Sequence, residues 1–381
     1  MRTLMLCAIL SLALLIPLGG CGGGGSTPPP PCTGSSCPPT SASDFLYESN
    51  SNQIFGFQVD ATTGAVDSTL TPVAGPALGG GLVITSNNFM YVADSGNNAV
   101  DGFSLDTSTG ALTALSGFPV TVDSGQGAQG MAVDPAGKFL FVPQHNTNEV
   151  AAYTISSGQL TPVAGSPFAT GGVFPVQAIV DPSGHFLYVA NNLDPLGTIS
   201  AFSIDSSTGV LTPILGSPFT TLINGGPSGM AVHPNGKFLY VGMVGAAGPT
   251  NQIVVESIDS ATGALLPVSG SPFLTGNEPN GLAIDPAGKF LFSANAGDGT
   301  VSAFTIDSAG GGLTEISGSP YTAGVQPTFL VTNSTSATLY ALDAQSTTIL
   351  AYTISSSGAL TPVAPINGGG GATGLAIVHK P

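Results

Sequence analysis

A short hydrophobic segment that ends in an aromatic residue recurs along the chain at nearly even spacing. From Tyr47 to Tyr340 the copies advance by about 49 residues a step. Such a period is typical of the four-stranded blade of a β-propeller. The copies are Phe45-Leu46-Tyr47, Phe89-Met90-Tyr91, Phe139-Leu140-Phe141, Phe186-Leu187-Tyr188, Phe238-Leu239-Tyr240, Phe290-Leu291-Phe292 and Thr338-Leu339-Tyr340.

Each repeat divides into four predicted strands. In the unit that contains Ser228, the pattern predicts an innermost strand over 229–232 and a second strand over 238–241. A third strand is predicted over 252–258, and a fourth begins at 265. Proline, asparagine and glycine separate these segments, because they supply the backbone angles that a tight reversal needs.

The two ends of the repeat array are complementary. The first complete repeat opens at Phe45 with a second strand, and the chain closes at 374–377 with a first strand that no second strand follows. We therefore predict that these strands pair in one blade, which leaves no free sheet edge. The predicted fold is an all-β, seven-bladed β-propeller of four-stranded blades over residues 44–381.

Composition and charge limit the classes of partner that the protein can bind. The chain has 54 glycines, 31 prolines and no tryptophan, which suits many short strands joined by tight turns. Its formal net charge is −16, with 5 basic and 21 acidic side chains. A surface this acidic repels nucleic acid, so we expect no nucleic-acid partner.

The first residues have the features of an export signal. Arg2 precedes an apolar run over 4–18 that is too short to span a bilayer. Leu18-Gly19-Gly20-Cys21 resembles the lipobox of bacterial lipoproteins, in which the cysteine is acylated and becomes the new N-terminus. We expect a signal peptide over 1–20 and a lipid anchor at Cys21 that holds the protein in the cell envelope, preferably at the outer membrane. The alternative is an ordinary secretory signal that contains a cysteine.

Residues 21–43 are rich in glycine, proline and serine and are predicted to form a tether. Cys32 and Cys37 lie inside it. In an oxidising compartment the two could form a small disulfide loop, and two free thiols are the alternative. No histidine or further cysteine lies nearby to complete a metal site, so no metal is expected there.

The turn and blade-end motifs resemble those of the β-propeller lactonase family. The resemblance rests on Asp285-Pro286-Ala287-Gly288-Lys289, on the Thr-Gly hairpins, and on Gly-Ser-Pro-Phe blade ends such as 165–168. It covers nearly all of residues 44–381 and extends in pattern to YVTN-repeat surface propellers. The family includes 6-phosphogluconolactonase-type enzymes, so the resemblance implies a lactonase scaffold. These motifs build blades, however, and function has to be argued from the site.

The positions where the resemblance implies cationic side chains are neutral here. A Pro-Arg-His-Met pattern of the family corresponds to 227–230, which places Ser228 at the arginine. A Pro-Arg-Gly pattern corresponds to 279–281, which places Asn280 at a second arginine, and a family histidine falls on or beside Val176. A bidentate arginine supplies charge and geometry that these residues cannot replace.

Strand order predicts where a ligand would bind. The start of each innermost strand and the loop between second and third strands share one face of the propeller, here called the loop face. We predict ligand-binding side chains on this face. The candidates are Gln129, Gln177, Asn191, Asn192, Ser228, Asn280 and Thr328.

Other candidates for chemistry are weaker. His145 is a possible general base on the loop face, with a solvated loop histidine as the alternative. Asp94, Asp194, Asp298 and Asp343 could ligate Ca²⁺, but aspartates cap turns more often, so no cofactor is expected. Glu256 stands where the other repeats have an aromatic residue. One interpretation is an exposed patch or a partner contact. The other is relaxed packing on an outer strand.

Two functional interpretations remain open. The first is a non-catalytic envelope propeller that presents its loop face to a glycan, peptide or protein. The second is a lactone hydrolase that acts on an unphosphorylated sugar lactone or a related cyclic ester. The neutral residues at the expected cationic positions favour the first interpretation over the second.

Overall fold

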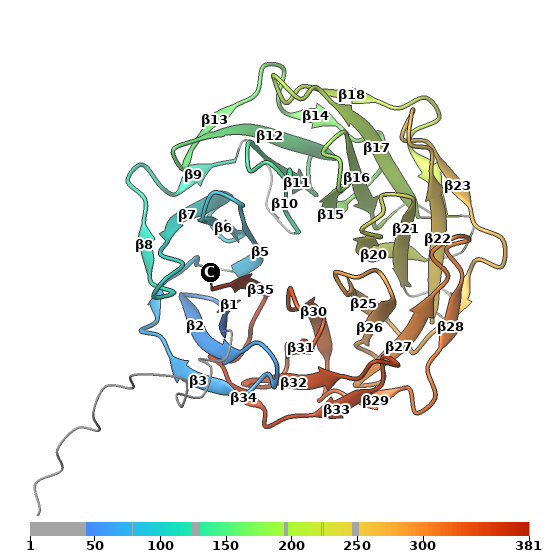
Figure 1. The fold of residues 1–381 in the computed structure, drawn as a ribbon. Helices are drawn as coiled ribbons and strands as arrows, with labels where there is room; N and C mark the ends of the chain where they lie inside the picture. The colour runs from blue at the N-terminus through green and yellow to red at the C-terminus, as the bar shows by residue number, and fades with distance from the viewer. Residues whose placement is uncertain are drawn as a thin grey trace, which may run out of the picture. The chain divides into compact units, whose positions relative to one another are not determined.

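The computed structural model describes residues 43–77, 79–122, 130–193, 197–221, 223, 225–245 and 251–380. Its strands form seven antiparallel sheets arranged as blades around a common centre (Figure 1). Blade 1 combines β35 with β1–β4, and blades 2 to 7 follow in chain order from β5 to β34. The predicted seven-bladed propeller is confirmed. Cys21, Cys32 and Cys37 lie outside the described residues, so the anchor and the disulfide stay predictions.

The innermost and second strands of each blade match the hydrophobic repeat. The innermost strands are β35 (Gly374–His379), β5 (Gly79–Ile84), β10 (Ala132–Val133), β15 (Pro175–Val180), β20 (Gly226–Val232), β25 (Pro279–Ile284) and β30 (Pro327–Thr332). The second strands are β1 (Ser43–Ser49), β6 (Phe89–Asp94), β11 (Phe139–Gln144), β16 (Phe186–Asn191), β21 (Phe238–Val244), β26 (Phe290–Asn295) and β31 (Thr338–Asp343).

The third strands are continuous, and each pairs with two short outer pieces. The third strands are β2 (Gln53–Asp60), β7 (Ala99–Leu105), β12 (Glu149–Ser156), β17 (Thr198–Ile204), β22 (Gln252–Ile258), β27 (Thr300–Ile306) and β32 (Thr348–Ile354). The first outer pieces are β3 (Val66–Thr69), β8 (Leu112–Ala114), β13 (Gln159–Pro162), β18 (Leu211–Pro213), β23 (Leu265–Pro267), β28 (Leu313–Glu315) and β33 (Leu360–Pro362). The second outer pieces are β4 (Val73–Ala74), β9 (Val120–Thr121), β14 (Phe168–Ala169), β19 (Phe219–Thr220), β24 (Phe273–Leu274), β29 (Tyr321–Thr322) and β34 (Ile366–Asn367).

The Gly-Ser-Pro-Phe motif explains why the outer strand is broken. In blade 3, Gly165 has a φ of +85°, a conformation that glycine adopts without steric cost. The next residue, Ser166, accepts a hydrogen bond at Oγ from the backbone N–H of Ala152, at 2.9 Å. The serine therefore satisfies a ladder donor that the break would leave unpaired. Ser217, Ser271 and Ser319 do the same in blades 4, 5 and 6.

The aromatic repeat joins neighbouring blades. In blade 4 the hydroxyl of Tyr188 donates to the backbone carbonyl of Gly263, in the Thr-Gly turn of blade 5, at 3.0 Å. A Cβ on Gly263 would lie 2.4 Å from the Phe186 ring, so only glycine fits against that aromatic residue. Tyr47, Tyr91 and Tyr240 make the same bond to the next blade. The sequence repeat thus encodes the contact between blades as well as the strands.

Closure pairs the two ends of the described chain. Strand β35 runs antiparallel to β1, with Leu46 opposite Ile377. At the end of this ladder His379 Nδ1 lies 2.8 Å from the buried carboxylate of Asp44. The predicted interlocked blade is confirmed. No helix in the described ranges is long and apolar enough to cross a membrane.

Glu256 occupies a buried position between blades. It lies opposite Leu239 on β21 and Pro267 on β23, and its residue is 4% exposed. The interpretation of an exposed patch is therefore wrong. The same position in the other blades holds a buried aromatic residue, namely Phe57, Phe103, Tyr153, Phe202, Phe304 or Tyr352.

We expect Glu256 to make stability depend on pH. Burial raises the pKa of this carboxyl from 4.5 to about 7, so the folded protein favours the neutral form. Its contribution is fully present below pH 4.5 and is lost as pH rises through about 7. The free energy of unfolding falls by about 3 kcal/mol over this pH range. Thermal unfolding of wild type and Glu256→Gln, each at the acidic and at the neutral end of the range, measures the loss. Parallel pH dependence of the two proteins would contradict the assignment.

Candidate functional site

Five innermost strands have a bulge at their start, and in four of them the bulge follows a proline. The register of β15, β20, β25 and β30 against its partner shifts just after a proline. A bulge inserts an unpaired residue and re-aims its side chain, and proline suits such a site because it has no N–H to pair. The bulged residues include four that the sequence placed at this position, namely Val176, Ser228, Asn280 and Thr328.

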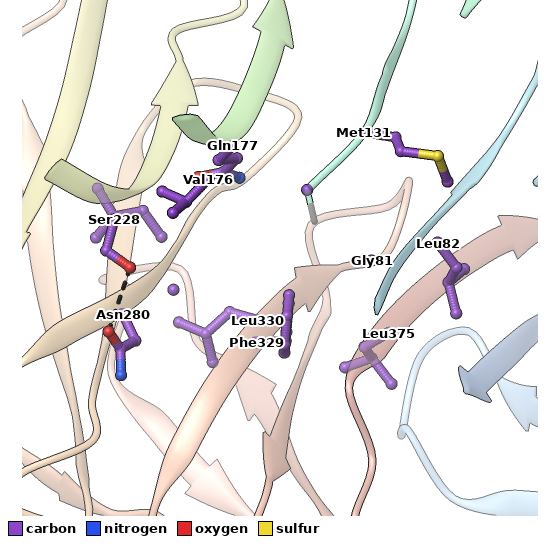
Figure 2. A pocket seen from close by; sticks show the side chains of 13 residues that line it. Gly81, Leu82, Met131, Val176, Gln177, Ser228, Asn280, Phe329, Leu330 and Leu375 are labelled. Carbon is purple, nitrogen blue, oxygen red and sulfur yellow. Dashed lines mark hydrogen bonds between the residues drawn. The ribbon is translucent and has the colours of Figure 1, made fainter. Parts of the chain in front are cut away.

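A cavity of about 270 Å³ lies between the innermost strands. All seven innermost segments contribute to it, so it lies at the centre of the ring. Figure 2 shows Gln177, Ser228 and Asn280 on one side of the cavity. Leu82 and Met131 lie on the opposite side. We call the first side the polar wall. We call the second side, with Leu375, the apolar wall, and include in it Phe329 and Leu330, which lie between the two sides.

Hydrogen bonds orient the side chains of the polar wall. The backbone N–H of Met230 donates to Oε1 of Gln177 at 2.7 Å. The Nε2 amine of Gln177 takes no part in this bond. Ser228 Oγ donates to Oδ1 of Asn280 at 3.2 Å. The Nδ2 amine of Asn280 likewise takes no part in this bond. Within the described chain neither amine donates a hydrogen bond to protein. The wall therefore offers two neutral N–H₂ donors and the lone pairs of one hydroxyl.

Three of the predicted ligand-binding residues, Gln177, Ser228 and Asn280, thus line one wall, and the other described candidates do not line the cavity. Gln129 is outside the described residues. Thr328 does not line the cavity, and its Oγ1 is buried without a hydrogen-bond partner in the described chain.

Asn191 and Asn192 hold the loop face together. Asn191 is fully buried, and its Nδ2 donates to Oγ1 of Thr198 and Oγ of Ser200 at 3.1 and 2.8 Å. Asn192 Nδ2 donates to the backbone carbonyl of Pro227 at 3.0 Å. Neither lines the cavity. Buried asparagine at the end of a second strand braces the hairpin that follows, and the bond from Asn192 ties that hairpin to the next blade.

His145 packs against an aromatic ring outside the cavity. Its imidazole stacks on Phe174, with ring centroids 4.4 Å apart. Burial lowers the pKa of this histidine, which favours the neutral ring. Phe174 has a φ of +61° and is held there by a bond from its N–H to Oδ1 of Asn148. The histidine supports the start of β15, and the structure does not bring it to the cavity lining.

The cavity has no ionisable lining among the residues that the structure describes. Lys138, Lys237 and Lys289 lie in the turns between innermost and second strands, at the end of the blades opposite the loop face. An entering phosphate dianion would meet only neutral donors in a protein of net charge −16.

The acidic residues considered for Ca²⁺ serve as turn caps where they are described. Asp343 accepts the backbone N–H groups of Val325 and Gln326, and Asp298 accepts that of Asn277. Asp94 accepts from Asn97, and Asp194 lies outside the described residues. In the described ranges, no three histidine, cysteine, aspartate or glutamate side chains are placed to hold a metal ion.

The apolar wall was not anticipated from the sequence. Met131 lies two residues beyond the candidate Gln129, but no candidate was selected near Leu82 or Leu375. The hydrophobic residues of the innermost strands were not considered as ligand-binding residues.

Fold and cavity together define a seven-bladed propeller with a ligand-sized cavity among its innermost strands. The model of the family "Lactonase, 7-bladed beta-propeller" matches residues 53–221 and 216–322, and the chain belongs to this family. The resemblance predicted from the blade motifs is confirmed.

Curated relatives are named as lactonases. A 6-phosphogluconolactonase of Serratia proteamaculans is 28% identical over 181 residues, which cover 45% of this chain and 51% of the relative. One from Pectobacterium carotovorum is 23% identical over 184 residues, with the same coverage. The chain spans about half the length of the curated relatives it matches. A periplasmic gluconolactonase of Pseudomonas aeruginosa has the same fold, with a TM-score of 0.72 and 16% identity over 90% of this chain and 100% of that one.

These comparisons correct the functional interpretation. The non-catalytic binding module favoured from the sequence is wrong, because the family is one of lactonases and the matching relatives carry lactonase names. The inference failed because it treated lost cationic residues as lost catalysis. Cationic residues at these positions are needed to bind a charged substrate. A wall of neutral residues can still bind a neutral ester.

Proposed function

We propose that this protein is a lactone hydrolase that acts on an unphosphorylated sugar lactone or a related cyclic ester. The observation that carries the proposal is the polar wall, where the amide oxygens of Gln177 and Asn280 accept from Met230 and Ser228 and, among the described residues, their amines have no protein acceptor. Neutral donors on one wall of the cavity suit an ester carbonyl, whose oxygen becomes negative in the transition state.

The reaction needs one water molecule and no redox partner. The water oxygen attacks the carbonyl carbon, the bond from that carbon to the ring oxygen breaks, and the ring oxygen takes up a proton that the water releases. The product is a hydroxy acid. In this scheme Gln177 and Asn280 donate to the carbonyl oxygen as its charge grows, and the hydroxyl of Ser228 accepts a hydrogen bond from the attacking water and orients it.

We expect the protein to discriminate against a phosphorylated substrate. The phosphate of 6-phosphogluconolactone is a dianion, and it would lose hydration on entering a cavity whose described lining has no cation. Purified protein should therefore hydrolyse glucono-δ-lactone faster than the spontaneous reaction and leave 6-phosphogluconolactone at its spontaneous rate. Acid release at constant pH measures both.

His145→Ala serves as the control in the same assay. Because this side chain stacks on Phe174 away from the cavity lining, its removal should leave turnover of the neutral lactone in place. Rapid turnover of the phosphorylated lactone would contradict the neutral-substrate proposal. Loss of all turnover in the His145 variant would show that this histidine takes part in the reaction and that the cavity is not the site as described.

A further inference from the structure

The two walls of the cavity differ in what they can bind. Among the described lining residues, polar side chains come only from β15, β20 and β25, which are neighbours in the ring. Across the cavity, Leu82, Met131 and Leu375 belong to blades 2, 3 and 1, and their residues are between 5% and 7% exposed. A ligand that fills the cavity therefore meets hydrogen-bonding side chains at one end and hydrocarbon at the other (Figure 2).

A second cavity lies farther along the innermost strands, below both walls. That cavity, of about 440 Å³, lies along the same innermost strands and shares Leu282, Leu330 and Leu375 with the first. Thr332 is the one polar side chain in its described lining, and its hydroxyl already donates to the backbone carbonyl of Ile284 at 3.2 Å. The remaining side chains of this lining are aliphatic, methionine or proline, so this second cavity suits hydrocarbon.

A sugar lactone would use only the polar part of these surroundings. It carries hydroxyl groups around its ring, and only those near the polar wall would find side-chain partners. Each hydroxyl dehydrated against the apolar wall without a partner costs binding energy, whereas each methylene placed there contributes to it. The cavity walls thus favour a cyclic ester with one polar edge and a hydrocarbon substituent.

We propose that the substrate is an uncharged lactone that bears an unbranched alkyl chain. Its ring carbonyl contacts Gln177 and Asn280, and its chain runs along Met131 and Leu375 toward the second cavity. The assignment rests on the proposed lactonase function and specifies its substrate class. Hydrolysis again proceeds by attack of water on the ring carbonyl carbon and cleavage of its bond to the ring oxygen. The product is a hydroxy acid with an alkyl chain.

The test compares γ-lactones that differ in chain length, with a sugar lactone alongside. Purified full-length protein is assayed with γ-butyrolactone, γ-octalactone, γ-decalactone and glucono-δ-lactone. We expect kcat/KM to rise by roughly fourfold for each methylene that the apolar wall covers. Met131→Gln makes the apolar wall polar at similar size, Phe329→Gln makes it polar with a smaller side chain, and either should flatten the rise with chain length. Leu215→Gln, at a side chain that is 96% exposed on the outer rim, is the matched control and should retain it.

A binding measurement separates failure of the substrate class from failure of the enzyme function. 2-Pentylcyclopentanone has a ring carbonyl and an alkyl chain but no ester to cleave, and calorimetry should detect it in wild type and weaker binding in Met131→Gln. Binding without turnover of any lactone would overturn the lactonase function and leave the ligand class standing. Turnover of glucono-δ-lactone and γ-butyrolactone with no gain from a chain would overturn the alkyl assignment alone. A rise of kcat/KM with chain length that persists in both Met131→Gln and Phe329→Gln would also overturn the alkyl assignment.

Discussion

A chain that ends before Gly374 should aggregate or melt far below the full-length protein. It lacks β35, so β1 loses its innermost partner along the ladder that places Leu46 opposite Ile377. The two cavities lose Leu375, and an edge is exposed on each side of the gap. Removing the apolar contacts of Leu375, Ile377 and Val378 costs about 5 kcal/mol.

Circular dichroism melting and light scattering measure this effect. The control is a chain that lacks only Lys380 and Pro381, which retains the whole of β35 (Gly374–His379). A truncated protein that melts with this control would show that pairing of β35 with β1 does not hold the ring closed.

Gln177→Glu should abolish most lactone turnover and leave the fold intact. The variant keeps the oxygen that accepts the N–H of Met230, so the contact between blades 4 and 5 survives. It replaces the free amine with an oxygen that cannot donate and that carries charge when ionised. Loss of one such donor lowers kcat by about 10²–10³-fold. A negative group facing the carbonyl oxygen opposes the developing charge further.

Steady-state kinetics on a neutral lactone, together with a melting curve, test this prediction. Asn280→Asp makes the same exchange at the second donor while keeping the acceptor for Ser228. Gln53→Glu, at the exposed first residue of β2, is the matched control for the change of charge. Wild-type kinetics in both cavity variants would show that the polar wall does not contact the reacting carbonyl.

Local patterns made most of the scaffold predictable. The Phe-Leu-Tyr repeat, the Asp-Pro-x-Gly-Lys turns and the Thr-Gly hairpins each act over a few residues or between adjacent blades. The carboxylate of Asp285, for example, accepts the N–H groups of Lys289 and Phe290 within one turn. Closure could also be inferred, because a ring of repeats has to use its unpaired first and last strands.

The candidate site was only partly predictable, because its residues come from all seven blades. The positions of Ser228 and Asn280 followed from strand order, since each comes just after a proline at the start of an innermost strand. Asn191 was misplaced because no sequence pattern distinguishes a buried asparagine that bonds to Ser200 from one that faces a ligand. The apolar wall was missed because inward-facing leucines look the same whether they fill a core or line a cavity.

The sequence by itself determined the number of blades, the order of their strands, the closure of the ring and the neutral character of positions 228 and 280. These properties follow from periodicity and residue type, which are local. Only the tertiary structure decided which side chains meet at the centre, which amide atoms stay free there and how deeply Glu256 is buried. The physical reason is that a donor's freedom and a carboxyl's hydration depend on neighbours from other blades, about 49 residues or more away in the chain.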